Sequence, residues 1–366
     1  MIFIIHFSVI ILLFIFSKLI KRDKFFVFST FTYSLFVFGQ RWMVGTDFGN
    51  YLMYYIYDYQ GTEVGYRFLQ NIFTEYNLSF SLFVFLLYLL TQFNFYKFMS
   101  KFNMDYTLII LFYCLSEIYF AETSQIRQWI AISFFVNAYY YLYFKKYVKT
   151  FFLILLGFIF HKSIIFVIPF MFIKFDKLIK IKKLAPLFIL ILLCLPFVNL
   201  NYAFSFLHIF DFVKDYEDSR YVVSLSYFHI AKYYFLIICT LIMLNNIDWI
   251  KIKLNSMIIN GQLIYLFLYG LSMQMGAFIR FAYFFKIFEI LFFVCLIPFL
   301  RGIDKKQMLI LFTIYSFIMY GAISIIDTVE LSHYRMRLIS IFEPYSDQQL
   351  IIEFYDFLQR AGRLNN

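Results

Sequence analysis

The feature that most constrains the fold is a succession of apolar runs, each about as long as a bilayer is thick. A helix that crosses the hydrocarbon core needs about 20 apolar residues, and about 17 suffice. Such runs lie near 2–17, 25–39, 78–96, 105–121, 127–144, 184–199, 226–247, 257–279, 283–300 and 308–326, with a further run near 150–173. The sequence therefore predicts an all-α, polytopic membrane helix bundle of eleven or twelve segments.

Charged residues are too few to build a water-exposed surface. They make up 15% of the 366 residues, against 63% hydrophobic residues, whereas a soluble domain carries about a quarter charged residues. We therefore expect a single integral membrane domain over 1–366, surrounded by membrane lipid. The net charge of +10 is mostly lysine in short loops, where it sets topology and meets anionic lipid. Nucleic-acid binding is not indicated.

Two segments differ from simple spans. The run at 150–173 is interrupted at His161-Lys162-Ser163 and has lysines beyond both ends, so the positive-inside rule places both ends in the cytoplasm. Each half is about eleven residues long and reaches only ~16 Å, which predicts a broken or re-entrant hairpin. Residues 347–360, DQQLIIEFYDFLQR, predict an amphipathic C-terminal helix that lies at a surface.

Lysines and arginines divide between the two sides of the predicted bundle. Lysine-rich loops recur at every second crossing, and seventeen of their nineteen basic residues are lysine, so we expect these loops in the cytoplasm. The alternate loops, including the long ones near 40–77 and 200–225, then face outward. The nine other arginines fall on or near that side: Arg41, Arg67, Arg127, Arg220, Arg280, Arg335, Arg337, Arg360 and Arg363. A guanidinium binds phosphate through a planar fork, so the set favours an anionic substrate, with a salt bridge as the alternative for any one arginine.

The first outer loop holds candidate catalytic and binding residues. Residues 41–55 read RWMVGTDFGNYLMYY, and an E-V-G-Y stretch begins at Glu63. Asp47 could orient Arg41 or accept a hydrogen bond from a sugar hydroxyl. Tyr51 could stack on a sugar ring or simply anchor the interface.

Two further stretches add a possible anion site and a possible base. SQIRQWIA opens a membrane helix just after Glu122, and its N-terminal N–H groups favour an anion together with Arg127 and Gln128. His161, in F-H-K-S, lies at the break in the 150–173 run. An imidazole there can serve as general base near neutral pH, and the alternative is a histidine that is only hydrogen-bonded in the core.

The order of these motifs resembles the EpsG/Wzy group of bacterial membrane polymerases, which make O-antigen, capsule or exopolysaccharide. The residues that carry the resemblance are R-x-x-x-G-T-D-F-x-x-Y (Arg41 to Tyr51), E-x-G-Y (Glu63 to Tyr66), I-R-Q-x-I-A (Ile126 to Ala131), F-H-K-S (Phe160 to Ser163) and S-R-Y (Ser219 to Tyr221). The resemblance implies a GT-C-like glycosyltransferase in the bacterial inner membrane, with its active site facing the periplasm. Donor and acceptor would both be oligosaccharides on undecaprenyl diphosphate, and a chain-length regulator protein would be a further partner.

The resemblance and the charge argument together assign roles. The general base would be His161, Asp47 or Glu63. The diphosphate would be bound by Arg41, Arg127, Arg220 and Arg280, of which Arg280 rests on the charge argument alone. The glycan would meet Gln128, Tyr51 and Glu122. Because arginines would neutralise the leaving group, we expect no metal and no cofactor.

Two other functions fit a basic multi-pass bundle. A flippase for the lipid-linked repeat unit would need basic groups reachable from the cytoplasm and usually shows an internal repeat; the arginines lie outside, and no repeat is visible. An O-antigen ligase shares the donor and differs only in its acceptor. No nucleotide-binding or metalloprotease motif is present.

Overall fold

The computed structural model describes residues 2–45, 47–102, 106–175, 185–197, 227–247, 255–300, 304–326 and 334–360. Within these ranges the chain is helical and has no strand, only three isolated bridges. The predicted all-α bundle is therefore confirmed. The chain divides into two compact units, one formed by Met1–Lys162 with Ile314–Asn366 and the other by Ser163–Thr313.

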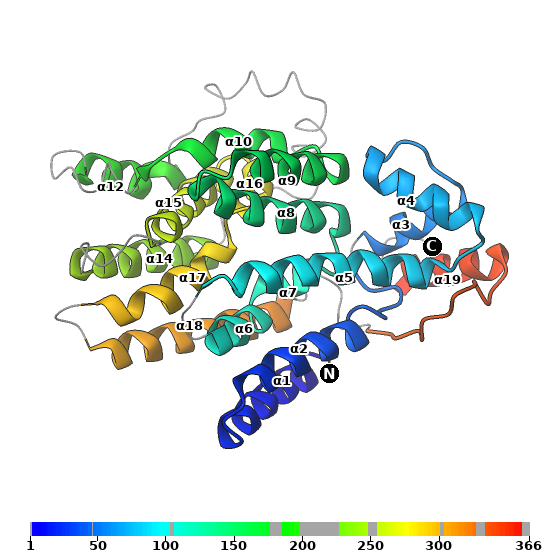
Figure 1. The fold of residues 1–366 in the computed structure, drawn as a ribbon, viewed down its shortest axis with the longest axis horizontal. Helices are drawn as coiled ribbons and strands as arrows, with labels where there is room; N and C mark the ends of the chain where they lie inside the picture. Colours follow the sequence, from blue (N-terminus) through cyan, green and yellow to red (C-terminus); the bar gives the residue numbers. More distant parts are fainter. Residues whose placement is uncertain are drawn as a thin grey trace. The chain divides into compact units, whose positions relative to one another are not determined.

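The first unit contains most of the predicted site. Its helices are α1 (Ile2–Leu19), α2 (Asp23–Val37), α3 (Phe48–Ile56), α4 (Val64–Glu75), α5 (Phe80–Met99), α6 (Tyr106–Cys114), α7 (Glu117–Ala121), α8 (Ile126–Tyr143), α9 (Tyr147–Phe160) and α19 (Asp347–Arg360) (Figure 1). The second unit holds α10 (Ile164–Phe172), α12 (Ala185–Cys194), α14 (Tyr227–Asn246), α15 (Asn255–Ser272), α16 (Ala277–Tyr283) and α17 (Ile287–Leu296), with short 3-10 turns at Leu195–Phe197 and Ile297–Phe299. α18 (Lys305–Ile326) has residues in both units.

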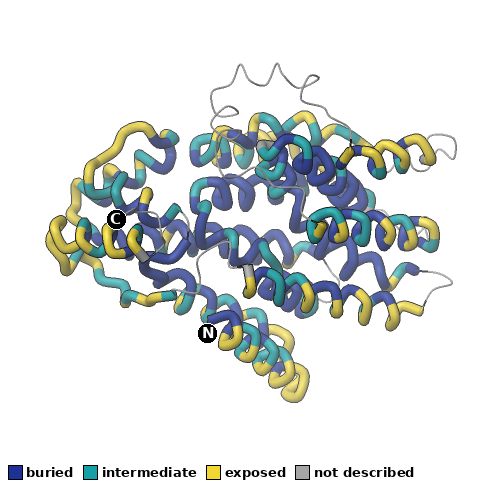
Figure 2. The backbone as a smooth tube through the Cα atoms, turned by 180° about the vertical axis from the view of Figure 1, so that it is seen from behind, coloured by how far each residue is buried: buried dark blue, intermediate teal, exposed yellow. Residues whose placement is uncertain are grey.

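Several helices match the dimensions of a bilayer. In the described ranges, five are long and apolar enough to cross it: Ile2–Leu19, Phe80–Met99, Tyr227–Asn246, Phe278–Phe299 and Lys305–Ile325. Shorter apolar helices lie at Tyr147–Phe160, Pro186–Phe197 and Ser256–Ser272. In Figure 2 the N-terminal hairpin of α1 and α2, beside the N label, carries exposed residues along its length. The exposed residues of α1 include Ile4 and Leu12, as expected of a lipid-facing surface.

Two predicted continuous segments are wrong in detail. The segment at 105–121 is divided into α6 and α7, because Ser116 has extended backbone before α7 and its hydroxyl donates to the carbonyl of Tyr113 at 2.8 Å. The segment at 257–279 ends at Ser272, whose hydroxyl donates to the carbonyl of Tyr269 at 2.7 Å. The predicted break at His161-Lys162-Ser163 is confirmed, since α9 ends at Phe160 and α10 begins at Ile164. The re-entrant hairpin and the total of eleven or twelve segments stay predictions.

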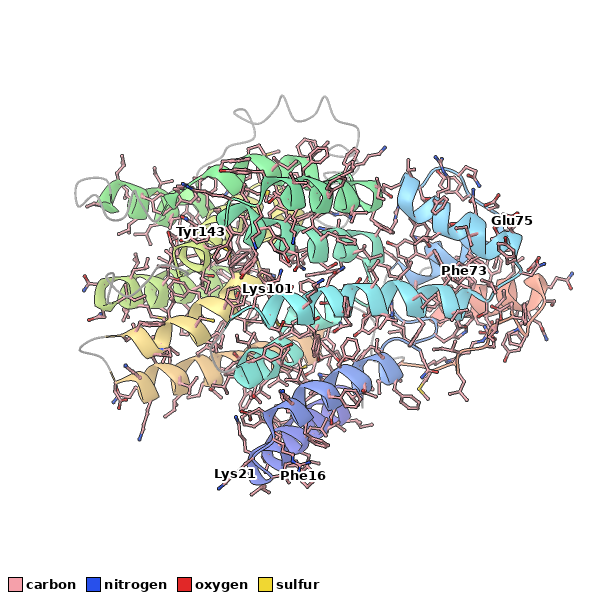
Figure 3. All side chains as sticks on the ribbon, viewed as in Figure 1. Phe16, Lys21, Phe73, Glu75, Lys101 and Tyr143 are labelled. Atoms are coloured by element: carbon pink, nitrogen blue, oxygen red, sulfur yellow. The ribbon has the colours of Figure 1, made fainter. Side chains whose placement is uncertain are left out.

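The two ends of the first unit differ in their basic residues. At the C-terminal end of α5, Lys101 lies 4.5 and 4.4 Å from the ring centres of Tyr140 and Tyr141. The turn between α8 and α9, which carries further lysines, therefore lies near the end of α5. Lys24 at the start of α2 and Lys97 near the end of α5 line one groove. We call residues 18–24, 97–102 and 144–149 the lysine end. Figure 3 labels Lys101 near this end of α5 and Glu75, in α4, near the other end.

The opposite end brings together segments that are far apart in the sequence. Arg41 Nε donates to the carbonyl of Thr123 at 2.9 Å, and the backbone N–H of Ser79 donates to the carbonyl of Ile341 at 2.8 Å. We call residues 38–47, 76–79, 122–127, 161–162 and 334–346 the arginine end. The predicted separation of lysine from arginine is thus present in this unit, with Arg22 and Lys162 as exceptions. Which end faces the cytoplasm stays a prediction.

The segment 40–77, which the sequence predicts as an outer loop, is not an open loop. It folds into α3 and α4, whose 9 and 12 residues are too few to cross a bilayer, and α19 packs against α3. A cluster of buried side chains joins them: Trp42, Phe48, Tyr51, Leu52, Tyr66, Phe73, Leu350, Phe354 and Phe357. A helix occupies Asp347–Arg360, the segment predicted as amphipathic, and its apolar face covers α3. Its position at a membrane surface stays a prediction. Gly49 permits the close approach, because a Cβ there would lie 2.5 Å from the Phe354 ring.

Candidate functional site

Arg127 lies in the first turn of α8, at the arginine end. Its Nη1 donates to Oε2 of Glu63, and its guanidinium carbon lies 5.4 and 5.8 Å from the ring centres of Tyr51 and Tyr66. Two aromatic faces thus hold a side chain that is 23% exposed. Its Nε is buried and has no hydrogen-bond partner among the described residues. The guanidinium therefore keeps donor capacity beyond its contacts with the protein.

Glu63 connects Arg127 to His161. While Oε2 accepts from Arg127, Oε1 lies 2.9 Å from Nδ1 of His161. The side chains of Glu63 and His161 are only 12% and 14% exposed. A carboxylate on one ring nitrogen orients an imidazole and stabilises the imidazolium that forms when the other nitrogen takes a proton. One carboxylate thus joins a cation and a candidate base.

Three helix ends position this triad. Glu63 has extended backbone just before α4, Arg127 begins α8, and His161 has extended backbone just after α9. Gly65 permits α4 to approach α9 closely, because a Cβ at this position would lie 2.9 Å from the backbone oxygen of Ile159. Each of three residues in the E-V-G-Y stretch therefore has a role. Glu63 bridges Arg127 and His161, Gly65 permits the close contact with α9, and the Tyr66 ring packs on Arg127.

We expect Gly65→Val to separate α4 from α9 and to weaken the contact between Glu63 and His161. Overpacking of this kind costs about 1–3 kcal/mol, so the melting temperature and the activity should both fall. Gly321→Val is the matched control, because a Cβ at Gly321 meets nothing within 4 Å. Equal melting temperatures for Gly65→Val and the wild-type protein would contradict the close contact.

The electrostatics of the triad favour an ionised Glu63. Burial raises the pKa of its carboxyl, but the hydrogen bond with His161 and the charges of Arg127 and His161 outweigh burial and lower the pKa from 4.5 to about 2. Burial raises the pKa of the Tyr51 hydroxyl too, and here it outweighs the neighbouring charge of Arg127, so that the pKa rises to about 12. Tyr51 therefore stays a neutral hydroxyl beside Arg127.

The lowered pKa predicts a pH-dependent stability. Because the carboxyl titrates below its ordinary value of 4.5 when folded, its stabilising contribution is complete above that pH and is lost as the pH falls towards 2. We expect Glu63→Gln to lower the melting temperature at pH 7, and the difference from wild type to shrink below about pH 4.5. Glu75→Gln, at an exposed carboxylate at the C-terminal end of α4, should show no such trend. A difference that is constant with pH would contradict the ionised bridge.

Arg41 and Glu122 are buried, and each forms hydrogen bonds within the protein. Arg41 is 3% exposed and donates from Nη1 to the carbonyl of Phe38 at 2.8 Å, besides its bond to Thr123. Glu122 is 2% exposed and accepts from Gln92 and from the Tyr113 hydroxyl. These contacts tie Arg41 to the segment between α7 and α8, and Glu122 to α5 and α6. Nη2 of Arg41 nevertheless has no partner among the described residues.

Two of the remaining predicted residues, Asp47 and Gln128, lie in the first unit. Asp47 immediately precedes α3 and is close enough to Tyr51 to act on it electrostatically. Gln128 is buried beside Arg127 in α8. Arg280 is in the last turn of α16, in the second unit, and Arg220 lies outside the described residues. No group of three His, Cys, Asp or Glu side chains able to hold a metal is present in the described ranges.

The other described arginines of the first unit do not share the position of Arg127 in the triad. Arg337 lies between the rings of Trp42 and Tyr345, 4.1 Å from each ring centre, and its Nη2 bonds Glu343. Arg67 donates to the carbonyl of Gln60 at 2.7 Å. Both arginines therefore stabilise local structure. The ion pair of Arg337 is the alternative that the sequence analysis kept for any one arginine. Sequence reasoning missed Tyr66 as a ring beside Arg127, although the E-x-G-Y spacing places Tyr66 three residues after Glu63.

One protein-family model matches most of the chain. The EpsG family matches residues 24–336, a range that contains Arg41, Glu63, Arg127 and His161. No curated protein and no solved structure matches the chain, so the GT-C-like architecture stays a prediction. Because the match covers most of the sequence, the chain belongs to the EpsG family, the family of Wzy-type polysaccharide polymerases.

Proposed function

We propose that this protein joins oligosaccharide repeat units carried on undecaprenyl diphosphate, at the outer face of the bacterial inner membrane. One observation carries the proposal: Glu63 holds an arginine by one carboxylate oxygen and a histidine by the other. The reaction needs a cation for a diphosphate leaving group and a base for an attacking hydroxyl. Membership of a polymerase family supports the same reaction class.

The proposed reaction is a glycosyl transfer. The acceptor hydroxyl attacks the anomeric carbon of the donor, and its proton passes to Nε2 of neutral His161. The bond from the anomeric carbon to the phosphate oxygen breaks, and undecaprenyl diphosphate leaves with the electron pair. Arg127 faces the developing negative charge, where a preorganised guanidinium stabilises the transition state. Glu63 stabilises the imidazolium through Nδ1.

The other predicted residues keep their roles as proposals. Arg41 has a buried N–H without a partner among the described residues, which supports a second contact to the diphosphate. Arg220 and Arg280 are proposed as further diphosphate contacts. Tyr51, Gln128 and Glu122 are proposed for the glycan, and Asp47 is the alternative base.

Deletion of the gene, followed by a gel of the surface polysaccharide, tests the proposal. A polymerase predicts loss of the ladder with a single repeat unit remaining on its carrier or core. Loss of every repeat unit would instead indicate a flippase or a ligase. Complementation with the wild-type gene and with Gly321→Val provides the positive controls.

We also expect the reaction to proceed without a metal ion, because arginine supplies the charge that a metal often provides. Purified protein assayed with an excess of EDTA should retain its rate of chain elongation. Full inhibition that added Mg²⁺ reverses would contradict leaving-group stabilisation by arginine alone.

A further inference from the structure

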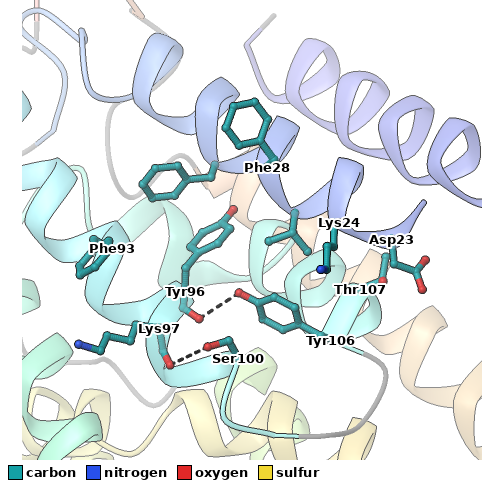
Figure 4. Close-up of a pocket in the computed structure, with 11 residues that line it drawn as sticks. Asp23, Lys24, Phe28, Phe93, Tyr96, Lys97, Ser100, Tyr106 and Thr107 are labelled. Carbon is teal, nitrogen blue, oxygen red and sulfur yellow. Dashed lines mark hydrogen bonds between the residues drawn. The ribbon is translucent and has the colours of Figure 1, made fainter.

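An apolar groove lies at the lysine end of the first unit, whereas the triad of Glu63, Arg127 and His161 lies at the arginine end. It has a volume of about 850 Å³ and runs between α2, α5 and the start of α6 (Figure 4). Its walls include Phe28 and Phe31 from α2 and Phe93 and Tyr96 from α5. A volume of this size lies within the range of small-molecule sites, about 300–1,000 Å³.

The groove opens on the outside of the unit. Phe28 is 71% exposed and Phe93 is 53% exposed, whereas Tyr96 is buried at 7%. Phe31 meets Tyr96 edge to face, with ring centres 5.0 Å apart. Exposed rings at the mouth and packed rings at the back give a lateral slot in a surface that faces lipid.

Two lysines stand at this slot. Lys24 is in the first turn of α2 and Lys97 in the last turn of α5, and both line the groove. Asp23 also lines it, but its carboxylate is bonded to Lys18 at 2.9 Å. Neither Lys24 nor Lys97 has an ion-pair partner among the described residues. The groove thus combines an apolar wall with two cations that form no ion pair with any described carboxylate.

We propose that the groove binds one anionic phospholipid from the leaflet at the lysine end. An acyl chain lies on Phe28, Phe31 and Phe93, and the phosphate lies at Lys24 and Lys97. Basic pockets between membrane helices recognise anionic head groups, while the apolar wall requires a chain attached to the phosphate. A zwitterionic lipid carries no net charge to match the two lysines. The site is independent of the proposed glycosyl transfer, because its test measures lipid binding.

Native mass spectrometry of the purified full-length protein tests the site. Phosphatidylglycerol is titrated against phosphatidylcholine, and the number of retained lipids is counted. We expect one phosphatidylglycerol to bind in preference, and Lys24→Ala and Lys97→Ala each to weaken it about fivefold. Phe31→Ala, which keeps both lysines, should weaken it as well.

The matched control is the pair Lys145→Ala and Lys149→Ala, which removes the same charge from the same end outside the groove. It should leave the preferred site unchanged. If the control pair weakened binding as much as Lys24→Ala and Lys97→Ala together, the attraction would be diffuse and the proposal would be wrong. Displacement of the lipid by inorganic phosphate alone would also overturn the proposal. Equal melting temperatures in phosphatidylcholine vesicles would verify that the lysine variants are folded.

Discussion

Arg127→Ala is expected to abolish the polysaccharide ladder and to slow chain elongation in vitro by about 10²–10³-fold, the usual cost of removing one preorganised donor to a developing anion. Arg127 is the guanidinium that Glu63, Tyr51 and Tyr66 hold in place. Its removal leaves Glu63 beside His161 without a neutralising cation. The measurement is the initial rate of elongation by purified protein at matched amounts.

Two variants separate charge from geometry. Arg127→Lys keeps the charge but loses the planar fork, so we expect partial activity at best. Arg67→Ala removes an arginine of α4 that bonds a backbone carbonyl and should keep nearly wild-type activity. If Arg127→Ala elongated chains at the wild-type rate, the proposed contact with the diphosphate would be wrong.

His161→Ala is the second large expected effect, a loss of about 10²–10⁴-fold, as for removal of a general base. The neighbouring Lys162→Ala is the control, because it changes the same turn and leaves the contact between Glu63 and His161 intact. Glu63→Gln should be impaired as well, since an amide stabilises an imidazolium less than a carboxylate does.

The double variant His161→Ala with Glu63→Gln distinguishes a shared role from separate ones. If Glu63 acts mainly through His161, the double variant should be little slower than His161→Ala alone. Losses that multiply would assign Glu63 an independent role through Arg127. A nearly active His161→Ala would move the base to Asp47, the carboxylate close to Tyr51.

The helices themselves were predictable because their signal is local. Runs of about 20 apolar residues correspond to α1, α5, α14 and α18, and the polar interruption at His161-Lys162-Ser163 ends α9. α3 and α4 were not predicted, because short helices in a polar loop form through tertiary packing on Trp42, Phe80 and α19. The spacing of residues along the chain does not indicate which distant segments will pack together.

The site was predictable in its members but not in its connections. Arg127, His161 and Glu63 stood out by residue type and position, yet 98 residues separate Glu63 from His161. No local pattern indicates that one carboxylate serves both partners. The division of lysine and arginine between the two sides also overstated the number of arginines available to a substrate. Arg337, for example, lies between two rings and is bonded to Glu343.

The most direct test of the joined cation and base is elongation by purified protein in vesicles with synthetic repeat units on undecaprenyl diphosphate. We predict one released undecaprenyl diphosphate for each glycosidic bond formed by the wild-type protein, and neither product from Arg127→Ala or His161→Ala at equal protein levels. Movement of the lipid-linked unit across the bilayer without any bond formed, or normal elongation by both variants, would contradict the account.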